Sequence, residues 1–246
     1  MSRHLVLRLD SPLIAFGGES IDNYGVIRDF PALSMVTGLI ANALGWDRRD
    51  GPLHDRLQQR LVIGCVLMQG SQKIQDYQTA QIAKADRGWT TRGYVEGRNG
   101  GEGTYKGSHL RFRDYHANLR SWVVISLKSP DESPTLDEIG AALDKPARPL
   151  FIGRKPCLPV GRLVAGWKDA ADVRSALQCV IDDGDVRTGL AWRAQWPDGE
   201  GQGPSDRVMD ICDERNWVSG VHGGWRRVRE GVLHRQEQKQ DQENTA

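Results

Sequence analysis

The sequence predicts an α+β fold of the ferredoxin-like or RRM-like type. Its expected elements follow the order strand, helix, strand, strand, helix, strand, because the spacing of the apolar residues alternates between the periods of strands and helices. With 246 residues, 39% of them hydrophobic, the chain is long enough to bury a substantial core. Its formal net charge of only +1 makes any local cluster of like charges informative.

The first half of the pattern begins at the N-terminus. Residues 3–9 alternate, with three leucines on one side, which predicts the first strand. In the stretch PALSMVTGLIANALGW, Ser34 is the expected N-cap of a helix, and Gly45 is expected to end it. The buried stripe of that helix is expected at Met35, Leu39 and Leu44. A shorter helix over residues 53–60 precedes the second strand, the apolar run at 61–68.

The second half of the pattern ends in a basic loop. Residues 122–127 (WVVISL) predict the third strand, and Thr135 and Glu138 have the spacing of a capping box at the start of the next helix. A fourth strand is expected to enter the loop near Phe151. Beyond it, the sequence predicts a helix at DAADVRSALQCV and strands over residues 186–196 and 216–221.

These elements suggest how the chain is divided. Residues 1–168 are expected to form the ferredoxin-like domain, with an insertion at 69–120, and residues 169–233 a small β-rich C-terminal subdomain. Residues 234–246 contain almost no apolar side chains, so a disordered tail is expected there.

The insertion at residues 69–120 is rich in glycines, aromatic rings and cations. Its aromatic residues are Tyr77, Trp89, Tyr94, Tyr105, Phe112 and Tyr115. The cations from residue 84 onward are Lys84, Arg87, Arg92, Arg98, Lys106, Arg111, Arg113 and Arg120, against four acidic residues over the same stretch. Cations hold phosphates and rings stack unpaired bases, so this composition suits single-stranded RNA. A loop that contacts another protein is the alternative interpretation.

A second basic region surrounds the sequence FIGRKPCLP at residues 151–159. Residues 145–168 contain six basic residues and no acidic one, which indicates an anionic partner such as a phosphate backbone. A solvated loop that happens to be basic is the alternative. The sequence GGWRRVREG at residues 223–231 adds three arginines, which either extend a nucleic-acid groove or form a solvated edge strand.

Several function classes are not indicated. The four cysteines, at positions 65, 157, 179 and 212, form no C-x-x-C pair, so neither a zinc site nor a disulfide framework is predicted. No cofactor or metal is expected. No apolar run reaches the length of a membrane span and the N-terminus lacks signal-peptide features, so a cytoplasmic protein that does not enter a membrane is expected. His4 and His54 are expected to be packing or surface residues.

Four segments in order, HLVLRLDSPLIAFGG, FPALSMVTGLIANALGW, IQDYQTAQ and PLFIGRKPCLPVGRLVAG, carry a resemblance to a known family. They resemble the successive landmarks of CasD-type subunits, the five-prime-handle subunits of type I-E CRISPR Cascade in the CRISPR-associated RAMP superfamily. The resemblance covers most of residues 3–168. Its most specific parts are the helix start around Ser34 and the loop at Gly153, Arg154 and Lys155.

The resemblance implies a non-catalytic RNA-binding subunit of a surveillance complex that supports crRNA-guided DNA target recognition in antiviral defence. Its partners would be the 5′ handle of the crRNA, the backbone, large and small subunits of Cascade and, through the complex, target DNA. The insertion at 69–120 would be a thumb-like hairpin that kinks the guide. The expected RNA-binding residues are Tyr24, Arg28, Ser34, Arg92, Arg111, Arg113, Arg154 and Lys155.

Two alternatives remain. CasD-related subunits of type I-C systems cut the CRISPR repeat, which implies a metal-independent endoribonuclease. Here Tyr105, Lys106 and His109 could supply the acid, base and cation, with Tyr115 and His116 behind them. A free-standing RRM-like RNA binder is the other alternative, although WVVISL lacks the aromatic spacing of an RRM strand.

Overall fold

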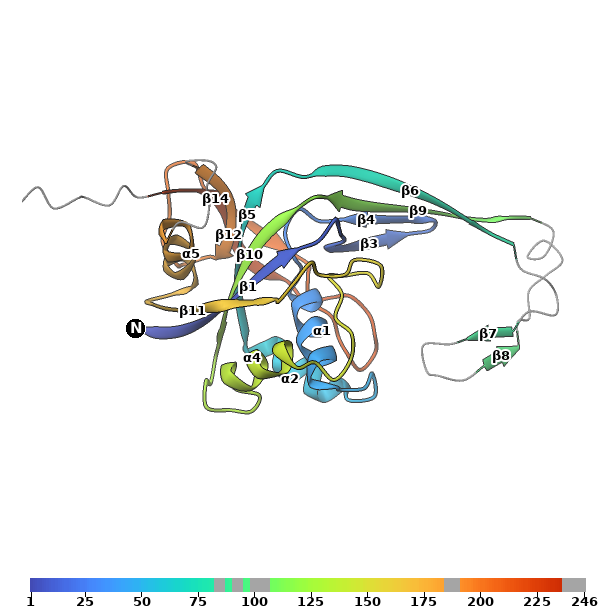
Figure 1. Ribbon diagram of the computed structural model, residues 1–246, viewed down its shortest axis with the longest axis horizontal. Helices are drawn as coiled ribbons and strands as arrows, with labels where there is room; N and C mark the ends of the chain where they lie inside the picture. The colour runs from blue at the N-terminus through green and yellow to red at the C-terminus, as the bar shows by residue number, and fades with distance from the viewer. Residues whose placement is uncertain (82–86, 90–94, 98–106, 184–190, 236–246) are drawn as a thin grey trace, which may run out of the picture.

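The computed structural model describes residues 1–81, 87–89, 95–97, 107–183 and 191–235. A seven-stranded antiparallel sheet forms the body of the molecule, and a second sheet extends from it as a long hairpin (Figure 1). The strands of the large sheet, in spatial order, are β11 (Val164–Ala170), β1 (Ser2–Asp10), β10 (Arg120–Leu127), β5 (Leu61–Gln69), β12 (Ala191–Pro197), β14 (Arg226–His234) and β13 (Arg207–Ile211).

The first four of these strands confirm the predicted α+β, ferredoxin-like fold. In their order, β11-β1-β10-β5, the first predicted strand (β1) lies between the fourth (β11) and the third (β10), as the split βαβ pattern requires. Helix α1 (Leu33–Leu44) and the following α2 (Gly51–Arg60) connect the first pair, and α4 (Leu136–Asp144) connects the second. The capping box at Thr135 and Glu138 is present, and Gly45 ends α1 in the left-handed conformation, as predicted.

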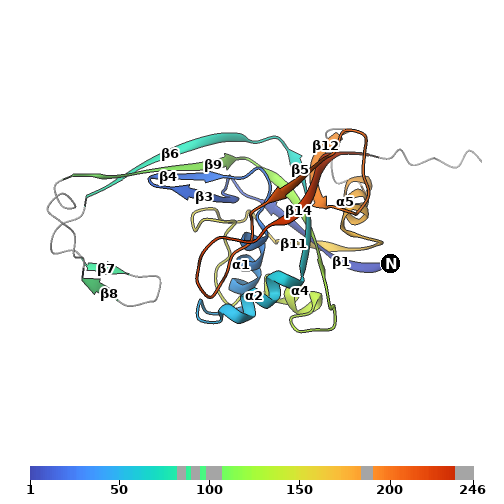
Figure 2. The ribbon, with the colours of Figure 1, turned by 180° about the vertical axis from the view of Figure 1, so that it is seen from behind.

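Side-chain alternation divides the core into two layers. Leu5, Leu7 and Leu9 of β1 pack with α1 and α4, whereas Val6 packs on the opposite face against α5 (Val173–Asp182). Figures 1 and 2 show α1, α2 and α4 on one side of the large sheet and α5 on the other. In α1, Leu39 is buried as predicted, but Met35 and Leu44 are only partly buried.

Three sequence predictions need correction, and one is met in its described part. The fourth strand is β11, because residues 151–160 form an irregular loop whose backbone bonds to itself through Ile152 and Cys157. Residues 216–221 form a turn closed by the bond from Gly220 N to Asn216 O (2.8 Å). The strand expected over 186–196 is β12, and residues 184–190 lie outside the described residues. The segment 223–231 enters β14, which β13 covers, so it is not an edge strand.

The C-terminal strands continue the large sheet through the pairing of β12 with β5. The division expected after residue 168 falls inside β11, and the separate C-terminal subdomain stays a prediction. The expected tail at 234–246 lies almost wholly outside the described residues.

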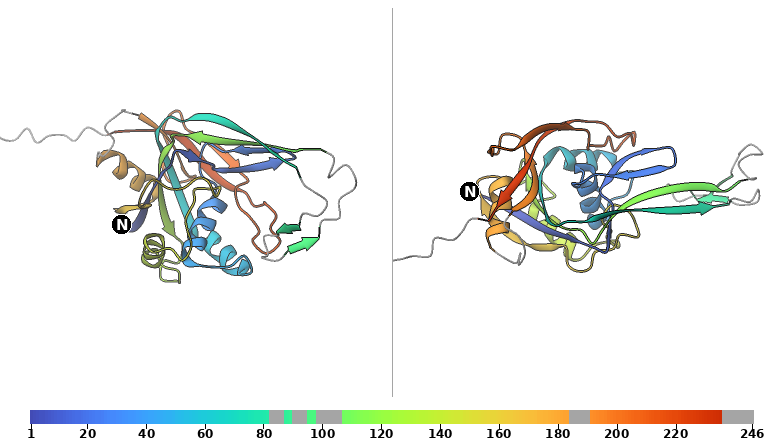
Figure 3. Two further views of the ribbon diagram at one scale, coloured as in Figure 1. Left: turned by 45° about the vertical axis from the view of Figure 1, so that its right-hand side comes forward. Right: turned by 90° about the horizontal axis from the view of Figure 1, so that it is seen from above.

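The second sheet contains two long strands from the insertion expected at residues 69–120, β6 (Gln72–Ala80) and β9 (His109–Ala117). Strand β9 pairs along its length with β6, and on its other side with β2 and β4. The remaining members are β2 (Leu13–Ile14), β4 (Tyr24–Ile27) and β3 (Gly17–Ile21), while β7 (Arg87–Trp89) and β8 (Val95–Gly97) form a separate short hairpin. Figure 3 shows from two directions that β6 and β9 project from the body.

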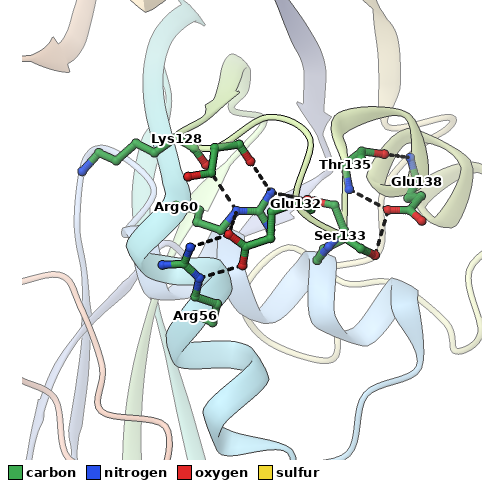
Figure 4. Close-up of polar contacts among 9 residues, drawn as sticks. Arg56, Arg60, Lys128, Glu132, Ser133, Thr135 and Glu138 are labelled. Atoms are coloured by element: carbon green, nitrogen blue, oxygen red, sulfur yellow. Dashed lines mark hydrogen bonds and ion pairs between the residues drawn. The ribbon is translucent and has the colours of Figure 1, made fainter.

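A buried arginine fixes the connection between β10 and α4. Arg60, which is 1% exposed, donates hydrogen bonds to the backbone carbonyls of Lys128, Ser129, Glu132 and Pro134 (Figure 4). Arg56 pairs with the Glu132 side chain on the solvent side. These bonds help to satisfy the carbonyl groups of an irregular segment.

Gly153 gives a test of how tightly the basic loop is docked. Its φ is +87°, and a Cβ there would lie 1.8 Å from the carbonyl oxygen of Ala15. Gly199 also has a positive φ (+99°), but its Cβ would meet nothing within 4 Å. We expect Gly199→Ala to lower the free energy of unfolding by about 1 to 2 kcal/mol through backbone strain. Gly153→Ala should cost a further 1 to 3 kcal/mol, roughly, from overpacking. Urea denaturation measures both, and equal losses would contradict the docking.

Candidate nucleic-acid interface

Internal carboxylates neutralise half of the basic window at residues 145–168. Arg162 pairs with Asp144 (2.5 Å), Lys168 pairs with Asp183, and Arg148 contacts Asp47 (3.1 Å) as well as two backbone carbonyls. These three side chains therefore stabilise the fold, and the local excess of charge in the sequence is smaller in space. Lys155 is exposed and pairs with no described residue.

Arg154 lies between the basic loop and the second sheet. Its Nη1 donates to the Asp114 carbonyl (2.7 Å) and its Nη2 to the Gly25 carbonyl (2.7 Å), and the guanidinium lies 4.9 Å from the Tyr115 ring. These two bonds use two of the five N–H donors of the Arg154 guanidinium within the protein. Because its acceptors are neutral, the positive charge of Arg154 remains uncompensated at this position.

Gly25 brings a second arginine next to Arg154. A Cβ at Gly25 would lie 2.6 Å from Nη1 of Arg113 and 2.8 Å from Nη2 of Arg154, so both guanidinium groups occupy the space over this glycine. On the same face of β9, Arg111 donates to the Asn23 side chain (2.6 Å) and to the Leu110 carbonyl (2.8 Å).

We call Arg111, Arg113 and Arg154 the cation face. Among the described residues, none of the three forms an ion pair with a carboxylate. Asp76 lies opposite Arg113 in the strand register, but it accepts a hydrogen bond from Gln78 instead (2.7 Å). Three adjacent guanidinium groups with neutral partners repel one another, and an anion placed beside them would relieve that repulsion.

The opposite face of the hairpin carries exposed rings. Phe112 stacks on Tyr24 of β4 (ring centroids 4.8 Å apart, planes within 11°) and contacts Tyr77 of β6 (5.2 Å). Tyr24 is 50% and Tyr77 is 55% exposed. Neighbouring residues of a strand point to opposite faces of its sheet. Phe112 therefore lies on the face that carries the rings, and Arg113 lies on the cation face. The sequence identified Tyr24 as a site residue, but it could not show that Phe112 joins it to Tyr77.

The N-terminus of α1 is closed by a carboxylate, which corrects the expected role of Ser34. The helix begins at Leu33, and its N-cap is Ala32, which makes no side-chain cap. The Leu33 N–H donates to Oδ2 of Asp213 (2.9 Å) and the Ser34 N–H to the Asp213 carbonyl (3.0 Å). Asp213 is 2% exposed and pairs with Arg226. An RNA phosphate therefore has no access to these N–H groups.

Other expected site residues are separated from the cation face or not described. Arg28 donates to the Cys212 carbonyl (2.7 Å). The arginines of segment 223–231 pair internally, Arg226 with Asp213, Arg227 with Asp210 and Arg229 with Asp198, so carboxylates of the chain compensate their charges. His109 begins β9, whereas Arg92, Tyr105 and Lys106 lie outside the described residues. The predicted catalytic set therefore stays untested.

A pocket of about 760 Å³ lies at the base of the hairpin, between β6, β9 and β12. His116, which is 3% exposed, lies between the Ser71 hydroxyl (2.8 Å from Nδ1) and the Arg28 carbonyl (2.8 Å from Nε2). Burial lowers the pKa of His116, and nearby Lys73 lowers it further, although the bond to the Arg28 carbonyl acts in the opposite direction. The sequence named His116 only as a neighbour of the catalytic set, because only the fold brings Ser71 to it.

Carboxylate and cations meet at the rim of this hairpin-base pocket. Asp29 contacts Lys73 of β6 (2.7 Å) and Arg193 of β12 (3.2 Å). Hydrogen bonding to Lys73 is the main cause that lowers the pKa of Asp29. The ion pairs connect the hairpin, the loop before α1 and the C-terminal strands.

Metal and membrane features were also sought in the described part of the chain. It contains no group of three or more His, Cys, Asp or Glu side chains that could hold a metal ion. Within the same ranges, no helix is both long and apolar enough to cross a bilayer.

Comparisons with known proteins agree with this architecture. A family model, Cas_Cas5d, described as CRISPR-associated protein (Cas_Cas5), matches residues 4–229. A chain of a solved structure described as "CRISPR RNA-guided surveillance complex" is similar with a TM-score of 0.70 and 19% identity, over 94% of this chain and 90% of that chain. Another, "Crystal structure of Cas protein", has a TM-score of 0.59 and 22% identity, over 94% and 95%. A search of curated proteins found no match. At these identities the solved structures show a shared fold.

Arg154 and Lys155 should differ in their effect on stability. We expect Arg154→Ala to lower the free energy of unfolding by about 2 kcal/mol, because it leaves two carbonyls without a charged donor. Lys155→Ala should change it by less than about 0.5 kcal/mol. Chemical denaturation followed by tryptophan fluorescence gives both values, and a stable Arg154→Ala variant would show that Arg154 does not hold the loop to the sheet.

The pair of Asp213 and Arg226 can be tested against an exposed pair on neighbouring residues. Asp213→Asn leaves Arg226 uncompensated in a buried place, and we expect a loss of about 3 to 5 kcal/mol in unfolding free energy. Asp210→Asn breaks the exposed pair with Arg227 and should cost about 1 kcal/mol or less. Similar losses for the two variants in thermal denaturation would rule out a special role for Asp213.

Proposed function

Because the chain belongs to the Cas5 family of CRISPR-associated proteins, we propose that it is a non-catalytic RNA-binding subunit of a Cascade complex of the CasD, type I-E kind. In this proposal it caps and holds the 5′ handle of the crRNA and contacts the adjacent backbone subunit. It thereby supports crRNA-guided recognition of target DNA in antiviral defence.

The cation face is the observation that carries this proposal. Arg111 and Arg113 lie on one face of β9, Arg154 lies beside Arg113 over Gly25, and their described partners are uncharged. A guanidinium group with unused N–H donors binds phosphate oxygens in a fixed geometry, and release of counterions from the RNA adds to the affinity. Lys155, exposed on the adjoining loop, extends the same positive region.

The proposed partners follow from the position of the hairpin. The crRNA handle lies along the cation face, while the hairpin projects away from the body, as Figure 1 shows, and reaches a neighbouring subunit of the complex. The exposed rings of Tyr24 and Tyr77 on the other face provide either a stacking surface or a contact with that neighbour. Large and small subunits and the target DNA would be reached through the complex.

The salt dependence of binding tests the cation face. We expect Arg113→Ala to weaken binding of a labelled handle-bearing RNA and to reduce the slope of log K against log salt by about 0.7, the value for one phosphate contact on a single strand. Arg113 is the best choice, since no described residue depends on it for a hydrogen bond. Fluorescence anisotropy from low to moderate salt measures the slope.

The matched control is Arg162→Ala, which removes an exposed arginine that pairs with Asp144. Its slope should equal that of the wild type. An unchanged slope for Arg113→Ala, or an equal change for Arg162→Ala, would remove the cation face from the RNA site. In the same samples with EDTA, the RNA should remain intact on a denaturing gel, and cutting of a repeat RNA would place the chain among the endoribonucleases.

A further inference from the structure

The hairpin-base pocket has the composition of a site for a small, flat and partly polar ligand. Leu67, Met68 and Leu119 supply apolar wall, whereas Ser71 and Asp29 supply polar groups at fixed positions. Its volume of about 760 Å³ falls within the range of ligand sites in proteins. It lies on the face of the hairpin that also carries Phe112, because His116 and Phe112 are four positions apart along β9 and every second residue of a strand points to the same face.

The hydrogen-bond directions in this pocket are determined by one carbonyl group. The carbonyl oxygen of Arg28 can only accept, so Nε2 of His116 must carry the proton of their 2.8 Å bond. Burial lowers the pKa of His116 and so favours the neutral imidazole, in which Nδ1 is an acceptor. The Ser71 hydroxyl must then donate its one proton to Nδ1. Toward the pocket, the Ser71 hydroxyl oxygen can therefore only accept a hydrogen bond.

The second polar group of the pocket has the same character. Lys73 and Arg193 hold the Asp29 carboxylate ionised, and an ionised carboxylate is an acceptor only. The two cations are themselves about half exposed, with side-chain exposures of 56% and 49%. The pocket thus combines an apolar wall, two acceptors and two cations at its rim. Arg193 also pairs with Glu230 (2.7 Å), so the two cations and the two carboxylates Asp29 and Glu230 sum to zero.

We propose that the hairpin-base pocket receives one nucleobase turned out of the bound RNA strand, and that it selects a base with an exocyclic amino group over uracil. The amino group donates to the Ser71 hydroxyl or the Asp29 carboxylate, the ring lies on the apolar wall, and the flanking phosphate lies near Lys73 and Arg193. Uracil presents a carbonyl where the amino group would lie, so two acceptors would face each other. This inference rests on the proposed function, since it requires RNA bound along the hairpin.

Binding of short single strands by the full chain tests the selection. We expect oligo(C) of about eight nucleotides to bind roughly tenfold more tightly than oligo(U) of the same length, the discrimination of one well-placed donor–acceptor contact. Ser71→Ala, which removes the hydroxyl acceptor, should reduce this ratio. Ser219→Ala in the exposed C-terminal loop is the matched control and should retain it.

A second variant keeps the test independent of the hydroxyl. Gly70 lines the pocket, and a Cβ at this position meets nothing within 4 Å, so Gly70→Trp can fill the space without distorting the backbone. We expect this variant to unfold at the wild-type temperature and to bind oligo(C) and oligo(U) equally. A ratio near one for the wild type, or a wild-type ratio that persists in both Ser71→Ala and Gly70→Trp, would overturn the proposal.

The failure of this inference can be distinguished from failure of the proposed function. If the wild type binds handle-bearing RNA with a slope that Arg113→Ala reduces, but shows no preference between the two oligomers, only the base pocket is wrong. If the wild type binds no RNA at low salt, the proposed function fails, and the pocket inference fails with it.

Discussion

The buried carboxylate of Asp213 is the contact on which the arrangement of the molecule depends. It accepts from the Leu33 N–H at the start of α1 and pairs with Arg226 of β14, so one side chain joins the first helix of the ferredoxin-like unit to the C-terminal strands. An ion pair buried in this way is retained only when its remaining hydrogen bonds are satisfied, which the helix N-terminus does here. The same contact determines where an anionic partner cannot bind. With the helix end occupied, the cation face on β9 is where adjacent guanidinium groups lie without an ion pair to a described carboxylate.

The charges of this chain show what a sequence can and cannot predict about a binding surface. A window of six cations without an acid looked like one basic patch, yet Arg148, Arg162 and Lys168 find carboxylates supplied by segments that precede or follow the window. Arg113 has no such partner, although its sequence neighbours include Asp114, because Asp114 lies on the opposite face of β9. A count along the sequence cannot separate these cases. Arg111, Arg113 and Arg154 were named as candidates from the sequence, but the sequence does not show that Arg113 and Arg154 lie together over Gly25, whose missing side chain leaves room for both guanidinium groups.

Local signals predicted the elements well where periodicity or capping chemistry was strong. The leucines of β1, the capping box of α4 and the glycine stop of α1 all depend on residues within a few positions, and each is present. The errors arose where a distant segment decides the structure. Ser34 has the residue type of an N-cap, but Asp213 supplies the cap from far along the chain. The apolar residues near Phe151 suggested a strand, but they are buried beneath an irregular loop that Gly153 packs against Ala15. Residues 216–221 have strand-like composition, yet Trp217 bonds to Gln58 of α2 and holds them as a turn.

The hairpin-base pocket illustrates how a buried histidine can set the chemistry of a surface without touching a ligand. The Arg28 carbonyl fixes the proton of His116 on Nε2, so Nδ1 accepts the proton of the Ser71 hydroxyl. The hydroxyl consequently faces the pocket as an acceptor. The ion pairs of Asp29 keep a second acceptor in place from the other side of the pocket. Neither effect is visible in the sequence, because Ser71, His116, Asp29 and Arg193 come from four separate segments. The two faces of β9 carry different chemistry, with guanidinium groups on one face and rings and acceptors on the other. A single strand of RNA that crosses the hairpin would therefore meet phosphate-binding groups on one face and base-reading groups on the other.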